Sequence, residues 1–129
     1  MNPMSRILIV DDEMPLSTLL TQTFEQEGHT VMTAGNGIEC MNKMSTFRPD
    51  VVIMDIMMPK LDGVDTTRLI RRNRNYSHTV IVALSAKADD DTRKKMREAG
   101  ANLFMRKPFA IGKLVSRVNQ ILEARSESK

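Results

Sequence analysis

Acidic, hydroxyl and amine side chains follow four short apolar runs of this sequence. Asp11 and Asp12 follow the first run, Asp55 the third, Ser85 the fourth and Lys107 the last. If the runs are parallel strands, their carboxyl ends meet at the edge of the sheet where such sheets bind ligands. Alone, each residue has an ordinary structural role, such as a helix N-cap, a turn residue or a surface cation. Together they predict one polar site.

Three carboxylates crowded at one edge repel each other, so either their pKa values rise or a cation lies among them. An all-oxygen set suits a hard divalent ion such as Mg²⁺ (or Mn²⁺), and the absence of His and Cys argues against zinc. Lys107 and Ser85 can bind phosphate oxygens. In such a phosphoryl-transfer site one carboxylate can be the nucleophile and form an acyl phosphate. Asp55, on the predicted central strand, is the best candidate.

Five apolar runs must position these residues. Most are near-continuous, which is typical of strands covered on both faces, and segments with helical periodicity separate them. The sequence predicts an α/β fold with a doubly wound, five-stranded parallel sheet, (βα)5. The predicted strands are 6–10, 30–34, 51–54, 80–84 and 103–105.

Helix boundaries are also marked. The first helix carries an apolar stripe that Glu27 interrupts, and the last helix is expected over 110–125. Glycines should end two helices, and acids that favour the positive end of the helix dipole should begin two others. The stripe is Leu16, Leu19, Leu20 and Phe24; the glycines are Gly28 and Gly100; the starts are Asp62-Gly63 and Ala88 to Asp91. Pro59, with Asp62-Gly63, should shape the loop after Asp55.

The 129 residues, of which 41% are apolar and 27% charged, indicate one soluble domain. It is expected over 1–125, with 126–129 a polar tail or linker stub. No apolar run approaches the roughly 20 residues of a membrane helix, and the start lacks the features of a signal peptide. The single cysteine, Cys40, is interpreted as a buried thiol. These features favour a cytoplasmic protein without membrane contact.

The net charge of +3 is too small to indicate nucleic-acid binding, and aromatic residues, at 4%, offer no evident stacking platform. Direct nucleic-acid binding is therefore not expected. The basic residues fall in two clusters interpreted as solvated helix faces, Arg68-Arg71-Arg72-Arg74 and Arg93-Lys94-Lys95-Arg97. His29 and His78 precede the second and fourth strands, so they should be surface or loop residues at the opposite, amino end of the sheet.

Four motifs, in this order and spacing, resemble the receiver domain of two-component response regulators of the chemotaxis-regulator type. The resemblance covers about residues 5 to 125. It implies a flavodoxin-like strand order of 2-1-3-4-5. The motifs are Val10-Asp11-Asp12, Asp55 to Pro59 with Asp62-Gly63, Leu84-Ser85-Ala86 and Lys107-Pro108-Phe109.

The resemblance implies a phosphorylation-dependent switch rather than an enzyme, with only self-catalysed phosphotransfer and autodephosphorylation. Asp55 would accept a phosphoryl group from a sensor histidine kinase or phosphotransfer protein. Asp12, Asp55 and the backbone carbonyl of Met57 would bind Mg²⁺, with Asp11 acting mostly through water. Lys107, before an expected cis Pro108, would hold a phosphoryl oxygen.

In such a switch, Ser85 would move toward the phosphoryl group and Phe104 would move inward behind it. The face of the fourth helix, fifth strand and fifth helix would then repack for a downstream effector or a fused output domain.

The sequence departs from the family at several positions. Phe104 replaces the common tyrosine, so it should report only by packing and favour a buried rotamer. Asn102-Leu103 and Lys113 stand where the winged-helix transcription-factor branch tends to carry acids, which puts that branch's dimerisation in doubt. Met57 and Lys87, which flank the phosphoryl group, are neither acid nor amide, so the aspartyl phosphate should be long-lived.

Three rival interpretations are weaker. A Mg²⁺-dependent aspartyl-phosphate phosphatase would need an acid at Met57. A flavodoxin-like flavin carrier would need a donor-rich loop where the chain has Asp11-Asp12-Glu13. A non-phosphorylated adaptor receiver would not need the acids and the lysine. The domain could act alone or as the regulatory piece of a larger protein.

Overall fold

Five strands and five α-helices alternate along the chain in a computed structural model that describes residues 4–58, 61–87 and 89–127. All strand pairs are parallel, in the order β2-β1-β3-β4-β5, which confirms the predicted fold class. The strands are β1 (Arg6–Val10), β2 (Thr30–Ala34), β3 (Val51–Asp55), β4 (Val80–Ser85) and β5 (Leu103–Arg106). The helices are α1 (Met14–Gln26), α2 (Gly37–Phe47), α3 (Gly63–Arg72), α4 (Asp90–Ala99) and α5 (Ile111–Glu127), with a short 3₁₀ turn, η1 (Arg74–Tyr76).

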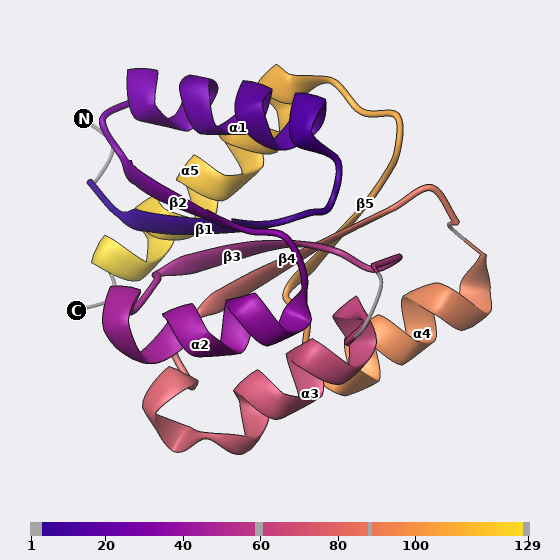
Figure 1. Ribbon diagram of the computed structural model, residues 1–129. Coiled ribbons are helices and arrows are strands. Elements are labelled where there is room, and N and C mark those ends of the chain that lie inside the picture. The colour runs from indigo at the N-terminus through magenta and orange to yellow at the C-terminus, as the bar shows by residue number, and fades with distance from the viewer. Residues whose placement is uncertain (1–3, 59–60, 88, 128–129) are drawn as a thin grey trace.

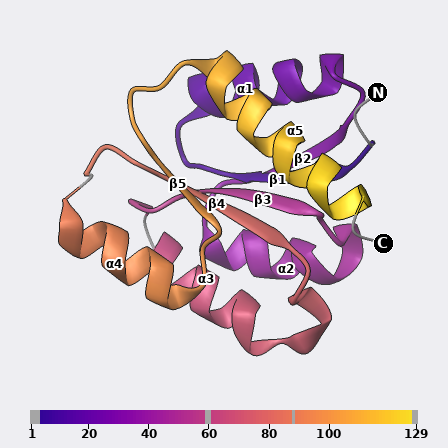
Figure 2. The same cartoon turned by 180° about the vertical axis from the view of Figure 1, so that it is seen from behind.

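The sheet separates two helical layers. Helices α1 and α5 cover one face, and α2, α3 and α4 cover the other (Figures 1 and 2). Alternate residues of β1 therefore enter different cores: Ile7 and Ile9 pack with α1 and α5, whereas Leu8 and Val10 pack with α2. This two-sided burial explains why β1, β3 and β4 are continuously apolar. At the edge, β2 is mostly exposed.

The predicted helix signals are largely confirmed. The side chains of Asp62 and Asp89 cap α3 and α4 by accepting hydrogen bonds from backbone N–H groups. Gly100, at φ +115°, ends α4, and Gly28, at φ +92°, follows α1. Ala88 and Pro59, which were assigned to a helix start and a loop, lie outside the described residues, as do 128–129. Helix α5 continues to Glu127, past the predicted end at 125.

The expected stripe of α1 is wrong at one position. Leu19 is 47% exposed, and Ser17 is buried in the layer that contains Leu20 and Phe24. The hydroxyl of Ser17 donates to the carbonyl of Met14, so this polar side chain is satisfied inside its own helix. The spacing of apolar residues alone could not show that Ser17 is buried and Leu19 exposed.

Cys40 is buried, as predicted, and burial raises the pKa of its thiol to about 12. Within the described residues, no helix has the length and apolar character needed to cross a membrane.

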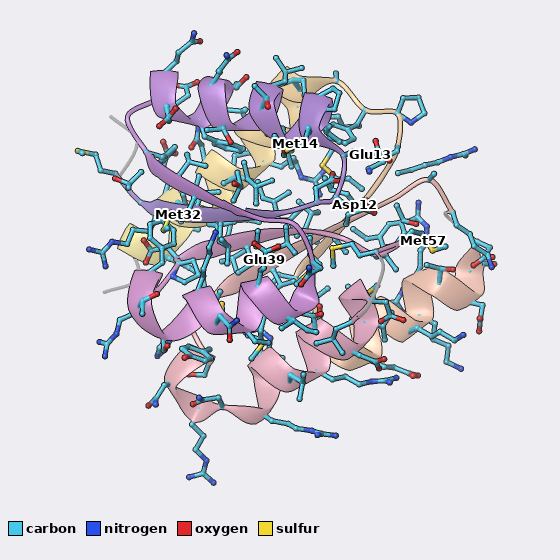
Figure 3. All side chains as sticks on the ribbon, in the orientation of Figure 1. Asp12, Glu13, Met14, Met32, Glu39 and Met57 are labelled. Carbon is cyan, nitrogen blue, oxygen red and sulfur yellow. The ribbon has the colours of Figure 1, made fainter. Side chains whose placement is uncertain are left out.

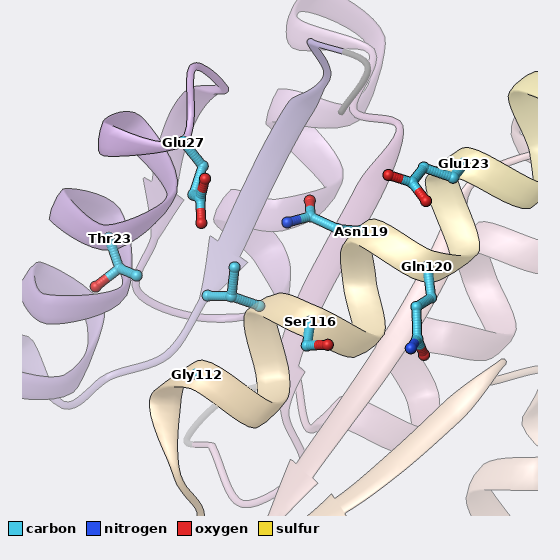
Figure 4. A pocket seen from close by; sticks show the side chains of 8 residues that line it. Thr23, Glu27, Gly112, Ser116, Asn119, Gln120 and Glu123 are labelled. Carbon is cyan, nitrogen blue, oxygen red and sulfur yellow. The ribbon is translucent and has the colours of Figure 1, made fainter. Parts of the chain in front are cut away.

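Both histidines lie in loops that precede strands, as predicted, but His29 is buried, whereas His78 is exposed. The backbone N–H of Ser5 donates to His29 Nδ1 at 3.1 Å, and His29 Nε2 lies 3.2 Å from Asn119 Oδ1. The Nδ1 atom is therefore an acceptor and the Nε2 atom carries the proton. Asn119 comes from α5 and also lines a polar groove between α1 and α5 (Figure 4). Partners so distant in sequence could not be inferred from the pattern.

Arg71 likewise departs from the solvated face predicted for its cluster. Its guanidinium donates to the carbonyls of Gly100 and Tyr76 and to Asn102 Oδ1, and Asn102 Oδ1 also accepts from the N–H of Ile81. Partial burial lowers the pKa of Arg71. This residue joins α3 to the segment between α4 and β5.

The start of α3 lies directly against the end of β3. A Cβ atom on Gly63 would lie 2.7 Å from the backbone carbonyl oxygen of Asp55 and 2.7 Å from Ile56 Cα. Both are backbone atoms, which cannot move aside as a flexible side chain can. The absence of a side chain at Gly63 therefore lets α3 begin directly against the backbone of Asp55.

Gly63→Ala is expected to lower the free energy of unfolding by about 1–3 kcal/mol, because overpacking forces the backbone apart. Gly112, near the start of α5, is the matched control, since a Cβ there meets nothing within 4 Å. Gly112→Ala should leave stability unchanged or raise it by up to about 1 kcal/mol. Urea denaturation of both variants measures the difference, and equal effects would contradict the packing argument.

Candidate functional site

The register of the sheet brings the ends of β1, β3 and β4 together. Val10 pairs with Met54, and Asp55 pairs with Leu84, so Asp11, Asp55 and Ser85 leave adjacent strands almost level. Asp12, Glu13 and Met57 lie at this same end of the molecule (Figure 3). The residues selected from the sequence therefore lie together at the carboxyl edge of the sheet, as predicted.

Lys107, which follows β5, lies beside the carboxylates of Asp55 and Asp11. Its Nζ atom lies 3.2 Å from Asp55 Oδ2 and 3.6 Å from Asp11 Oδ2. The backbone N–H of Lys107 donates to the carbonyl of Ser85, and the Lys107–Pro108 peptide bond is cis. Both carboxylates are buried, at 5% exposed for Asp11 and 3% for Asp55. One ammonium group is thus placed between two buried acids.

Burial controls the protonation of the acids. It raises the pKa of Asp55 to about 6, against the lowering effect of Lys107, and nearby Asp11 adds repulsion. Burial also raises the pKa of Asp11. For Lys107, burial alone would lower the pKa, but attraction to Asp55 and Asp11 raises it overall. The site therefore holds a firmly cationic lysine beside acids whose negative charge is costly.

A divalent cation fits this oxygen cluster. Carboxylate oxygens of Asp11, Asp12, Glu13 and Asp55 lie within 4.8 Å of one another. Asp11 Oδ1 accepts a hydrogen bond from the N–H of Glu13, but Asp11 Oδ2, which is buried, has no hydrogen-bond partner among the described residues. Lys107 lies 3.6 Å from this oxygen but makes no hydrogen bond to it, and a buried oxygen that still lacks a hydrogen bond in an all-oxygen set suits a hard cation such as Mg²⁺. Glu13 was not predicted as part of this set, although the run of three acids indicated it.

Met57 and Lys87 present backbone groups to the site. The N–H of Met57 donates to Asp55 Oδ1 at 3.2 Å, and its side chain is exposed. The N–H of Lys87 donates to Ser85 Oγ at 3.0 Å, while its ammonium lies 3.8 Å from the Asp89 carboxylate. The Met57 carbonyl as a metal ligand stays a prediction.

Phe104 is half-buried rather than wholly buried. Its ring packs on Ile56, Ala83 and Met96, and the guanidinium carbon of Arg93 lies 4.9 Å from the ring centroid. The ring thus makes a cation–π contact in addition to its packing, and the role of Phe104 in reporting phosphorylation stays a prediction. Arg93 was assigned to a solvated cluster, and no spacing in the sequence indicated this contact.

Comparison with known proteins gives a consistent result. A family model described as the response regulator receiver domain matches residues 7–119. The chain is 38% identical over 122 residues to the alkaline phosphatase synthesis transcriptional regulatory protein PhoP of Bacillus subtilis, covering 95% of this chain and 50% of the relative. It is 38% identical over 119 residues to the transcriptional regulatory protein CpxR homolog of Haemophilus influenzae, covering 92% and 51%.

The chain thus spans about half the length of the curated relatives it matches. Among solved structures, the chemotaxis protein CheY4 of Vibrio cholerae superposes with a TM-score of 0.87 at 28% identity. That match covers 93% of this chain and 100% of the other.

Because burial of the Asp55 carboxylate is costly, removal of its negative charge is expected to stabilise the fold. Without divalent ions at pH 7, Asp55→Asn is expected to raise the free energy of unfolding by about 1–2 kcal/mol, allowing for solvent screening. Because the folded-state pKa of Asp55, about 6, lies above its ordinary 3.8, the wild type loses stability as pH rises between these values. The gain should therefore be full above about pH 6 and vanish below about pH 4.

Urea denaturation with a chelator, repeated across this pH range, measures the gain. Asp65→Asn is the matched control, because Asp65 is exposed and its ion pair with Arg68 lies on the surface. That control should change stability by less than about 0.5 kcal/mol. A loss of stability in Asp55→Asn at pH 7 would show that the lysine outweighs the burial of the acid.

Proposed function

The chain belongs to the response regulator receiver domain family, whose members regulate two-component signalling, and from this premise we propose that Asp55 is its phosphoacceptor. The phosphoryl donor is a phosphohistidine on a sensor histidine kinase or a phosphotransfer protein. The outcome is an altered surface for a downstream effector or a fused output domain.

One observation carries the proposal. Lys107 Nζ lies 3.2 Å from Asp55 Oδ2, at the end of a central buried strand and beside the oxygen cluster of Asp11, Asp12 and Glu13. A nucleophile, a cation for phosphoryl oxygens and a candidate Mg²⁺ set therefore lie within a few ångströms. No single structural role accounts for all three.

The residues act in a simple sequence. With a pKa of about 6, Asp55 is mostly ionised at neutral pH, so a carboxylate oxygen can attack phosphorus. An O–P bond forms while the P–N bond of the donor breaks, and the imidazole leaves with the electron pair and takes up a proton. Lys107 then binds a phosphoryl oxygen. When bound, Mg²⁺ neutralises charge on the phosphoryl oxygens.

Asp12, Asp55 and the Met57 carbonyl are the proposed metal ligands, and Asp11 acts mostly through water. The switch then proceeds through Ser85, whose buried hydroxyl would leave the N–H of Lys87 for the phosphoryl group. Phe104 responds by moving inward.

Phosphorylation of wild type with acetyl phosphate and Mg²⁺ is expected to add the mass of one phosphoryl group. Asp55→Ala should abolish the gain, because it removes the nucleophile. Asp65→Ala, which removes an exposed carboxylate, should retain it. Intact-mass spectrometry makes the measurement, and the absence of any gain in wild type would overturn the proposed function.

The acyl phosphate is expected to be long-lived, because the exposed side chain of Met57 is apolar and the ammonium of Lys87 faces Asp89. Met57→Asn combined with Lys87→Glu supplies groups that can position a water molecule. Loss of phosphate should then be about tenfold faster or more.

Decay is followed by intact mass after removal of acetyl phosphate. Met57→Leu combined with Lys87→Arg is the control and should decay like wild type. If the Asn/Glu variant decays no faster than this control, these positions do not set the lifetime.

A further inference from the structure

A polar groove lies at the amino ends of β3 and β4, at the end of the sheet opposite Asp55. Its volume is about 450 Å³, and the end of α2 and the turn η1 form its walls. Figure 1 shows the end of α2 and the starts of β3 and β4 on one side of the molecule. A hollow of this size suits a small-molecule ligand. We refer to it as the amino-end groove; its lining includes Ser45, Arg48, Asp50, Asn75 and Tyr76.

Arg48 lines the groove from an unusual backbone conformation. Its φ is +53°, the one positive value outside glycine among the described residues. Glycine or asparagine usually takes this left-handed conformation at the end of a helix, and the proline that follows Arg48 favours an extended backbone instead. An arginine kept at such a position indicates a use for its side chain. Its guanidinium makes no ion pair within the part of the chain that the structure describes.

Asp50 presents a fixed carboxylate to the same groove. Its backbone N–H donates to the carbonyl of Arg6, and its carbonyl accepts from the N–H of Val80. Its Oδ2 atom accepts from the N–H of Arg6 at 2.9 Å, whereas Oδ1 accepts no hydrogen bond from any described residue. Asp50 and Arg48 are both exposed and make no ion pair with each other. The groove therefore contains two separate, unmatched charges of opposite sign.

The rest of the lining adds an aromatic surface and neutral polar groups. Tyr76 packs against the core beneath α2 and stays half-buried, so part of its side chain faces the groove. The exposed side chains of Ser45 and Asn75 can donate and accept hydrogen bonds. A simple anion would be repelled by Asp50, and a simple cation by Arg48. A ligand that carries both charges therefore fits this lining better than either ion.

We propose that the amino-end groove binds a small zwitterion, namely a free amino acid or a dipeptide. The ammonium group of the ligand pairs with Asp50 Oδ1, and its carboxylate binds the guanidinium of Arg48, which can donate two parallel hydrogen bonds. An apolar side chain of the ligand packs on Tyr76. Asp50 precedes the first residue of β3 and Asp55 is the last, so this site is separate from the phosphoacceptor and does not depend on the proposed function.

Backbone amide NMR spectra of the isotope-labelled full chain test the proposal. They are recorded with each standard amino acid and with a set of dipeptides at millimolar concentration. At least one compound with a large apolar side chain is expected to shift the signals of Arg48, Asp50 and Tyr76 in a saturable manner. Comparison of the Kd values of free amino acids and dipeptides identifies the source of the zwitterion. The absence of saturable shifts at the groove with every compound would overturn the proposal.

Blocking one charge of the ligand at a time distinguishes a zwitterion site from a simple ion site. N-acetylation removes the ammonium group and amidation removes the carboxylate, and each is expected to weaken binding about tenfold or more. Binding that survived N-acetylation, or inorganic phosphate that bound the groove more tightly, would show an anion site. Binding that survived amidation would show a cation site. Each of these results would overturn the assignment.

Two substitutions locate the ligand. Arg48→Gly removes the guanidinium but favours the left-handed backbone, so it should weaken binding about tenfold or more while the urea midpoint of unfolding stays unchanged or rises. Asp50→Asn keeps an oxygen that can accept from the N–H of Arg6, and it should also weaken binding about tenfold or more. Circular dichroism confirms that both variants fold.

The matched controls are Asp65→Asn and Arg68→Gln, which change an exposed ion pair on α3 outside the groove lining. Each should alter the Kd by less than about twofold, because surface charges at a distance are screened by salt. Equal weakening by the controls would show a non-specific charge effect. Unchanged binding in Arg48→Gly and Asp50→Asn would place the ligand elsewhere. Either result would overturn the proposal.

Discussion

Two buried carboxylates that share one lysine are the constraint on which the site depends. Asp11 and Asp55 are almost fully enclosed, and Lys107 lies within 3.6 Å of an oxygen of each. The single positive charge offsets only part of the cost, because the pKa values of both acids remain raised. The oxygens are therefore held in an arrangement that additional positive charge would stabilise. A cation among them would offset this charge, and a phosphoryl group on Asp55, which carries negative charge of its own, would increase the need for it.

Backbone contacts hold Asp11 and Asp55 in their buried positions, so the cost of burying their charge remains. Asp55 ends a fully buried strand, and the N–H of Ile56 still donates to Leu84, so the strand pairing extends beyond the acid. Gly63 packs against the backbone at Asp55, and the N–H of Lys107 is bound to the carbonyl of Ser85. The N–H of Asp11 likewise donates to the carbonyl of Ala34, so the sheet holds the backbone of each acid. The carboxylate charge, which water would solvate on the surface, therefore stays buried at the strand ends.

How much of this could be predicted depends on whether a feature is local in the sequence. Asp11, Asp55 and Lys107 could be selected because Asp11 and Asp55 directly follow apolar runs, Lys107 follows one after a single residue, and parallel strands bring their ends together. The contacts of His29 and Arg93 could not, because Asn119 lies 90 residues from His29 and because the crossing of α4 over β5, which places Arg93 on Phe104, is not recorded in the sequence pattern. The family resemblance identified Phe104 as a position of interest but not the cation above it. A periodic pattern records which face is apolar, and it does not record which polar groups satisfy one another.

Packed side chains connect the contact between Arg93 and Phe104 to the site. Ile56, the residue after Asp55, packs in one small cluster with Ala83 and Met96, and Phe104 closes that cluster on its outer side. In the proposed switch, a shift at Asp55 or Ser85 would reach Phe104 through these packed side chains and Arg93 through the ring. Inward movement of Phe104 would take the ring away from the guanidinium of Arg93. The cation–π contact would then belong to the unphosphorylated arrangement, and the proposed movement of Phe104 would have to offset its loss.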